Sequence, residues 1–291
     1  MFSGLFEQFI KEKRYLNNLS ERTLHSYRSD MFRRWMLYVG GMPTQAGINQ
    51  FVVKMREEGL AISTYNITIR SLNSFLSWLH RNGHIPQYLK AQQLRQERRI
   101  MKTFTEAQMK RLLSWKPSKN RNEIRLHVLM CLLADTGIRI NEALTLRLEN
   151  IDWDNLLIKI MGKGSKERIV PISIELRKVL HRYVTRQRVC KHMSPYLLCT
   201  SSGTQLTYQH IGRIFRGVVK DLGIEGFDSA FHAFRRFFGK NYLKNGGNLV
   251  YLQWLFGHAS ITTTKMYVED IDIEDLHRAH LRSSPLSRLK S

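Results

Sequence analysis

Apolar residues recur every three or four positions along much of this chain, and the period changes at one place. Leu24, Met31 and Trp35 follow the helical spacing in the first third of the chain. Residues 156–161 instead alternate, residues 162–165 supply turn residues, and residues 166–172 return as a second strand. The pattern therefore predicts a mainly α fold with one small β-hairpin in its second half.

The expected helices have recognisable starts and breaks. The first 80 residues are helical except near residues 17–20, 40–43 and 59–63, and Ser20 and Ser63 stand where N-caps belong. Thr105 and Gln108 form a capping-box pattern before the next helix. Further helices are expected near residues 124–134, from about residue 139, and near 174–188, 207–222, 229–243 and 249–256, followed by a short one that carries Tyr267.

Composition divides the chain into three segments. Residues 1–88 are expected to form a compact helical unit, and residues 104–291 a second unit with a C-terminal tail. Residues 89–103 are rich in Lys and Arg and poor in large apolar side chains, so we expect a basic linker. Such a linker can lie along a phosphate backbone, although a solvated helix face explains the same composition.

The charge of the chain points to an anionic partner. The sequence has 46 Lys and Arg against 24 Asp and Glu, a net charge of +22, which repels itself unless such a partner takes part. Nucleic acid is the first candidate. No apolar run reaches the ~18 residues of a spanning helix, and the start of the chain does not resemble a secretory signal. Three cysteines without a C-x-x-C pair make a disulfide framework unexpected and indicate a reducing, cytosolic compartment.

Motifs for common cofactors do not occur in the sequence. Residues 162–166 resemble a phosphate loop, but a Walker A sequence needs a glycine where Leu157 stands. The dinucleotide fingerprint lacks its third glycine, and the histidines and cysteines match no H-E-x-x-H or paired C-x-x-C pattern. We therefore expect no ATP, no NAD, no other cofactor and no metal.

Several polar residues of the second unit indicate a function only when they are considered together. His232 and Arg235 share a helix face, which alone indicates a solvated surface, and Tyr267 alone indicates packing. Together with Arg139, Lys163 and His258, they stand in motifs whose order and spacing resemble the tyrosine recombinase (phage integrase) family, of the Xer-like kind. The motifs are Thr136-Gly-Ile-Arg139-Ile-Asn-Glu142, Gly162-Lys163-Gly-Ser-Lys166-Glu-Arg168-Ile-Val-Pro171, His232-Ala-Phe-Arg235, Phe256-Gly-His258 and Tyr267.

Two positions depart from the pattern of that family. Phe256 stands where Leu is usual, and Arg236 stands where many relatives carry a second His. The Arg236 departure affects local hydrogen bonding and leaves the expected phosphate clamp complete.

The resemblance implies a helical N-terminal core-binding domain, a catalytic domain, and a role for each motif residue. Tyr267 would attack the scissile phosphodiester and remain bound to the DNA 3′-phosphate. Arg139 and Arg235 would hold the phosphate oxygens by bidentate hydrogen bonds. Lys163 would protonate the leaving 5′-oxygen. His232 would assist as acid or base, and His258 would hydrogen-bond the phosphate.

The resemblance also implies partners and a cellular setting. We expect a site-specific recombinase that cleaves and rejoins double-stranded DNA without ATP. It would act as a tetramer in the synaptic complex, in the cytoplasm with the nucleoid. Accessory DNA-bending or directionality proteins are further expected partners, and no membrane association is expected. A type IB topoisomerase and a catalytically silent DNA-binding protein are the alternatives. The candidates for DNA contact are Arg70, Arg95, Arg98, Arg99 and Arg213.

Overall fold

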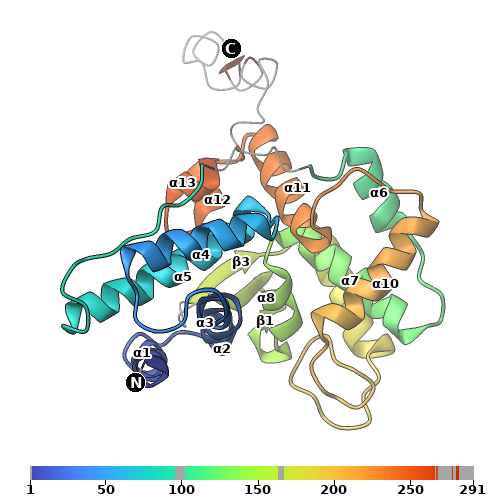
Figure 1. Cartoon of the computed structure of the whole chain (residues 1–291). Coiled ribbons are helices and arrows are strands. Elements are labelled where there is room, and N and C mark those ends of the chain that lie inside the picture. Colours follow the sequence, from blue (N-terminus) through green and yellow to red (C-terminus); the bar gives the residue numbers. More distant parts are fainter. Residues whose placement is uncertain are drawn as a thin grey trace. The chain divides into compact units, whose positions relative to one another are not determined.

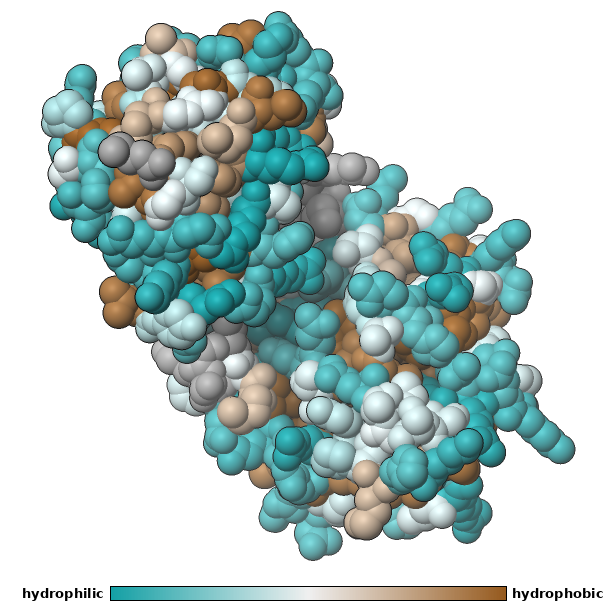
Figure 2. All heavy atoms as spheres, turned by 60° about the horizontal axis from the view of Figure 1, so that its bottom comes forward, coloured by the Kyte–Doolittle hydropathy of each residue, from teal (hydrophilic) through white to brown (hydrophobic). Residues whose placement is uncertain are grey.

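The computed structural model describes residues 2–95, 102–162, 167–265, 267, 277, 280 and 281 (Figure 1). The chain forms two compact units, Met1–Arg99 and Ile100–Ser291. The visible face in Figure 2 is largely hydrophilic, with apolar residues in smaller patches. No helix in the described parts is long and apolar enough to cross a membrane.

The regular secondary structure in the described part of the first unit is helical. It contains α1 (Phe2–Tyr15), α2 (Glu21–Ser26), the π-helical stretch η1 (Tyr27–Phe32), α3 (Arg33–Tyr38), α4 (Gln45–Glu57) and α5 (Ile62–Arg81). The residues at the junctions of α2, η1 and α3 keep helical torsion angles, so these three run on as one helix. Aromatic rings fill the core: Phe6 stacks on Phe32 with centroids 3.8 Å apart and meets Phe75 edge-on at 5.3 Å.

One of the two predicted N-caps of this unit is confirmed and the other is wrong. The Ser20 side chain accepts a hydrogen bond from the Thr23 amide, as a cap should. Helix α5 begins at Ile62 with Ala61 as its N-cap, so Ser63 lies inside the first turn. Leu60 and Tyr65 occupy the positions of a hydrophobic staple, and both belong to the apolar core. Their packing sets the start of the helix.

The chain after α5 folds back onto that helix. Leu89 and Ala91 are buried in the core of the first unit. The Asn73 side chain donates to the Ala91 carbonyl at 2.9 Å and accepts from the Ala91 amide at 2.8 Å. Asn66 makes the same pair of bonds with Leu94, both at 2.9 Å. The part of residues 89–103 that precedes Arg95 is therefore packed against the first unit.

The second unit combines helices with a three-stranded sheet, which confirms the predicted fold class. Strands β1 (Ile151–Asp152), β2 (Leu157–Met161) and β3 (Glu167–Pro171) pair antiparallel in that order, with Ile158 opposite Ile151 and Val170. The two-residue β1 was not predicted, because it is too short to show a period. The helices are α6 (Glu106–Ser114), α7 (Arg121–Thr136), α8 (Ile140–Thr145), η2 (Leu148–Asn150), α9 (Ile174–Arg182), η3 (Tyr183–Gln187), α10 (Tyr208–Asp221), α11 (Ala230–Lys244), α12 (Leu249–Phe256) and α13 (Ile261–Lys265).

Helix α7 is the central element of this unit. Its residues Leu126, Leu129 and Leu133 are fully buried, and it packs against α10 and α11 (Figure 1) as well as against α9. A helix that is apolar on several faces requires partners on several sides. The predicted capping box of Thr105 and Gln108 opens α6 and is confirmed.

The cysteines depart from the expectation. Cys190 and Cys199 are joined by a disulfide, and Cys131 is free. An odd cysteine count indicates one unpaired residue but does not exclude a pair.

Replacing Asn66 by Ala is expected to loosen the segment that follows Ala91. The change leaves a part-buried amide and a part-buried carbonyl of Leu94 without their partner, at a cost of about 1–3 kcal/mol. We predict a lower urea midpoint and faster trypsin cleavage at Lys90 and Arg95. Asn49→Ala is the control, because it removes only an exposed bond to Gln45 on α4. Equal cleavage of the two variants would contradict the predicted role of Asn66.

Candidate active site

A left-handed turn places the first candidate arginine. Helix α7 ends at Thr136 and is capped by Gly137, whose φ is +61° and whose amide donates to the Leu133 carbonyl. A Cβ atom on Gly137 would lie 2.6 Å from Phe238 and 2.7 Å from Phe256, so the turn needs glycine for space as well as for φ. Two residues later, Arg139 is the N-cap of α8.

A buried carboxylate links this arginine to the β-sheet. Glu142 accepts two hydrogen bonds from Arg168 of β3, at 2.9 and 2.7 Å. It also accepts from the backbone amide of Arg139 at 2.8 Å and from its Nη1 at 3.0 Å. Burial by itself would raise the pKa of Glu142, but the bonds from Arg168 and Arg139 outweigh it and lower that pKa. Glu142 is therefore ionised between two guanidinium groups.

Arg235 reaches the same place from α11. Only 5% of the residue is exposed, and its guanidinium lies 3.8 Å from the centroid of the Phe256 ring. Nη1 donates to the Gly137 carbonyl at 2.9 Å, and Nη2 donates to the Phe256 carbonyl at 2.8 Å. Burial, together with repulsion from Arg139, lowers the pKa of Arg235 to about 10. The group stays charged at neutral pH.

Three arginines converge on the C-terminal end of α12. The Phe256 carbonyl accepts from Arg139 at 3.1 Å as well as from Arg235. The preceding carbonyl, that of Leu255, accepts from Nε of Arg168 at 2.8 Å. Carbonyl groups at a helix C-terminus have no partner in the helix and carry partial negative charge, so cations are stabilised there.

The geometry fixes the protonation of His258. Its Nε2 lies 3.0 Å from Nη2 of Arg235, and because a guanidinium can only donate, Nε2 must accept. Nδ1 then carries the proton and donates to Oγ1 of Thr264 at 2.9 Å. Burial and the nearby charges of Arg235 and Arg139 lower the pKa of His258 to about 4. His258 is therefore a neutral acceptor that holds Arg235.

Tyr267 packs against the same phenylalanine. Its ring meets Phe256 edge-on at 5.3 Å, and the residue is 7% exposed. Gly239 of α11 makes room for the ring, because a Cβ there would lie 2.9 Å from it. Burial raises the pKa of the phenol, while the charges of Arg235, Arg236 and Arg139 oppose this rise. The prediction that a short helix carries Tyr267 was wrong, since α13 ends at Lys265 and Tyr267 lies in the turn that follows.

The other predicted site residues fall in different places. His232 is exposed on α11, and partial desolvation with the charges of Arg236, Arg235 and Arg139 lowers its pKa. Lys163 lies outside the described residues. Three of the predicted DNA contacts are exposed, namely Arg70 on α5, Arg95 after the packed segment and Arg213 on α10. They lie on other elements than the arginine cluster formed by Arg139, Arg168 and Arg235. Arg98 and Arg99 lie outside the described residues.

Three residues that organise the site have no role predicted from the sequence. Glu142 and Arg168 were already visible as letters of two motifs, but nothing in the sequence showed that they pair. Thr264 is fully buried and holds His258. The sequence gives little indication of this role of Thr264, because the residue lies among other threonines. Within the described ranges, no cluster of three or more His, Cys, Asp or Glu side chains is arranged to hold a metal ion.

Comparison with known proteins identifies the family. The model of the phage integrase family matches residues 102–272, more than half of the chain, so this chain belongs to that family. Tyrosine recombinase XerD of Listeria monocytogenes serotype 4b (strain F2365) is 28% identical over 95% of this chain and 98% of that protein. Tyrosine recombinase XerC of Staphylococcus epidermidis (strain ATCC 12228 / FDA PCI 1200) is 26% identical over 97% of each.

Solved structures share the fold. The XerH site-specific recombinase bound to palindromic difH substrate matches with a TM-score of 0.74 and 18% identity, over 96% of this chain and 83% of that one. The Tn1549 transposon integrase in complex with circular intermediate DNA matches with a TM-score of 0.76 and 20% identity, over 94% and 98%. The predicted enzyme class, a tyrosine recombinase that cleaves and rejoins DNA, is confirmed by the family match and the recombinase relatives.

Replacing Glu142 by Gln is expected to destabilise the second unit strongly. Three arginines would then share one site without their carboxylate, and breaking a buried ion pair costs about 3–5 kcal/mol. Because the pKa of Glu142 is lowered by folding, its contribution is complete above the ordinary value of 4.5 and disappears as pH falls below it. We predict a lower Tm at pH 7 and a smaller loss of Tm on acidification than in wild type.

The matched control is Glu149→Gln, which removes only an exposed pairing with Arg147. It should leave both Tm and its acid dependence unchanged. An identical acid dependence in Glu142→Gln and wild type would contradict the assigned charge state of Glu142.

His258 is expected to stay neutral well below pH 6. Since its folded pKa is about 4, against 6.5 for the free side chain, its contribution to stability is full above pH 6.5 and falls as pH decreases towards 4. NMR titration of the imidazole Cε1–H should show no protonation at pH 5.5, with the signal assigned by its loss in His258→Gln. A midpoint near 6.5 would contradict the hydrogen bond from Arg235.

Proposed function

We propose that the arginine cluster is the phosphate site of a recombinase in which Tyr267 is the nucleophile. The observation that supports this most is the convergence of Arg139 and Arg235 on the Phe256 carbonyl, with Tyr267 packed on the ring of the same residue. Within the described chain, the side-chain hydrogen bonds of Arg139 come from Nη1, and those of Arg235 come from Nη1 and Nη2, while each guanidinium carries five N–H donors. The remaining donors suit the non-bridging oxygens of a phosphate.

The reaction follows from these groups. The Tyr267 oxygen attacks the phosphorus of a phosphodiester, the bond to the 5′-oxygen breaks, and a 3′-phosphotyrosine ester forms. The developing negative charge falls on oxygens held by Arg139 and Arg235, whose positions are set before the substrate arrives. The departing 5′-oxygen takes a proton, for which Lys163 is the proposed donor. A 5′-hydroxyl of a second strand reverses the attack, so no ATP is consumed.

The histidines have different parts in this proposal. His258 accepts from Arg235 and is neutral, so it orients that guanidinium beside the phosphate rather than supplying a proton. His232 is exposed on the same helix as Arg235, and its lowered pKa keeps the imidazole unprotonated at neutral pH, so that it can accept a proton. Its neighbours Arg235 and Arg236 favour the unprotonated, base form.

The wider setting of the activity is also proposed. The chain would bind double-stranded target sites through both units, with residues 89–103 as a basic linker and Arg70, Arg95, Arg98, Arg99 and Arg213 as DNA contacts. The full length of the match to XerD and XerC supports a Xer-like recombinase. We propose that it acts as a tetramer on two duplexes in the cytoplasm. Accessory DNA-bending or directionality proteins are possible partners of such an assembly.

A nicked suicide duplex tests the nucleophile. Wild-type protein should leave a covalent adduct on a denaturing gel, and Tyr267→Phe should leave none, because the attacking oxygen is missing. Tyr251→Phe, which changes an exposed tyrosine of α12, should keep the adduct. An adduct that survives Tyr267→Phe would contradict the assignment. Adduct formation by neither wild type nor Tyr251→Phe would favour the catalytically silent alternative.

Arg139→Lys tests the phosphate clamp. Lysine keeps the charge but cannot make two parallel bonds, so DNA affinity should change little while the adduct rate falls about 10²-fold. Arg147→Lys, at an exposed position, is the control. Wild-type cleavage by Arg139→Lys would contradict the bidentate role. Exchange of strands between two target sites, without relaxation of a single plasmid, separates a recombinase from a topoisomerase.

A further inference from the structure

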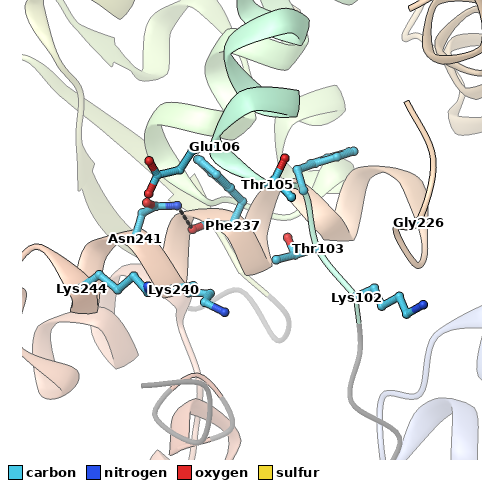
Figure 3. Close-up of a pocket in the computed structure, with 10 residues that line it drawn as sticks. Lys102, Thr103, Thr105, Glu106, Gly226, Phe237, Lys240, Asn241 and Lys244 are labelled. Carbon is cyan, nitrogen blue, oxygen red and sulfur yellow. Dashed lines mark hydrogen bonds between the residues drawn. The ribbon is translucent and has the colours of Figure 1, made fainter. Parts of the chain in front are cut away.

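The start of the second unit is fastened to the helix that carries the candidate active site. The Lys102 amide donates to Oδ2 of Asp228 at 2.9 Å, and the Asp228 amide donates to the Lys102 carbonyl at 3.1 Å. Thr103 Oγ1 donates to the Ala233 carbonyl of α11 at 2.7 Å. In Figure 3, Lys102 and Thr103 lie on the chain that runs past this helix. Lys102 lies within the basic linker predicted from the sequence.

Arg236 adds to these contacts of Lys102 and Thr103 with Asp228 and Ala233, which together we call the clasp. Its Nη2 donates to the Lys102 carbonyl at 3.0 Å and also to the Asp228 carbonyl. One side chain of α11 thus holds both carbonyl groups of the reciprocal Lys102–Asp228 pair. Arg236 directly follows Arg235 and takes the place of the histidine that many relatives carry.

The surroundings of the clasp store strain next to the site. Ser229, between Asp228 and the first turn of α11, has a φ of +56°, which is unusual for a residue with a Cβ. Among the described residues, the buried Nε–H of Arg236 has no hydrogen-bond partner. Strained backbone and an unsatisfied buried donor are costly, and they cluster at functional sites.

The charge of Arg236 acts on Tyr267 and His232, two of the proposed reacting groups. It favours the phenolate of Tyr267 and disfavours protonation of His232. The other charged groups that act on Tyr267 are Arg235 on the same helix and Arg139 before α8, while His258 after α12 is neutral.

We propose that Arg236 is a positioning residue that fastens the linker to α11 and thereby sets the place and charge environment of Tyr267. This inference rests on the proposed role of Tyr267 as the nucleophile. Through its bonds to the Lys102 and Asp228 carbonyls, Arg236 ties residues 102 and 228 to the helix that carries His232 and Arg235.

Arg236→Gln, Arg236→Lys and the control Arg177→Gln separate this role from its alternatives. Arg177 is exposed on α9. For each variant we would measure the Kd for the nicked duplex, the single-turnover adduct rate at saturating DNA, and the pH at which that rate reaches half its maximum. We expect Arg236→Gln to bind DNA within about threefold of wild type, to form the adduct at least tenfold more slowly, and to move the pH midpoint upward. Arg177→Gln should match wild type.

The conservative variant Arg236→Lys separates the effect of the positive charge from the effect of the hydrogen bonds. Arg236→Lys keeps the positive charge and one donor for the two carbonyls, so the pH midpoint should return to the wild-type value and the rate should recover in part. The double variant Asp228→Ala, Arg236→Gln should be no slower than Arg236→Gln, because both changes remove side-chain bonds of the same clasp.

Two results would overturn the proposal. A wild-type rate and pH midpoint in Arg236→Gln would show that the clasp has no influence on Tyr267. A loss of DNA affinity as large as the loss of rate would make Arg236 a DNA contact. If instead Tyr267→Phe still forms the adduct, the assignment of the nucleophile fails, and that failure is separate from either result for Arg236.

Discussion

The site depends on one buried carboxylate. Glu142 lies between the guanidinium groups of Arg139 and Arg168 and accepts hydrogen bonds from both. Without it, the neighbouring charges of Arg139 and Arg168 would lose their counter-ion in a partly buried site, which is costly. The same contacts join the α7–α8 turn to β3, so the fold of the second unit and the position of the arginines are set together.

The C-terminal end of α12 provides the complementary half of this arrangement. The carbonyl groups of Leu255 and Phe256 accept from three arginines, and the Phe256 ring packs against both Arg235 and Tyr267. In the proposed function, the cationic groups are therefore in place before the phosphate of the DNA binds, and little reorganisation is needed during the reaction. His258 adds to this order by fixing Arg235 from the other side.

Much of this could be predicted from the sequence, and the rest could not for physical reasons. The helical period, the hairpin and the five motifs predicted the fold class and the residues that meet at Phe256. The pairing of Glu142 with Arg168 was not predictable, because residues 26 positions apart in sequence meet only through the fold. The predicted start of α5 and the predicted helix at Tyr267 were wrong, because tertiary packing overrides local signals at the ends of elements. The docking of Ala91 and Leu94 on α5 also depends on tertiary contacts that composition does not reveal.

The most direct test of this account is the structure of the covalent complex formed on a suicide duplex. We expect the Tyr267 oxygen bonded to the phosphorus, with Arg139 and Arg235 both within hydrogen-bond distance of its non-bridging oxygens and Glu142 still held by Arg168. A phosphorus bonded to another side chain, or bonded to Tyr267 but remote from both guanidinium groups, would contradict it.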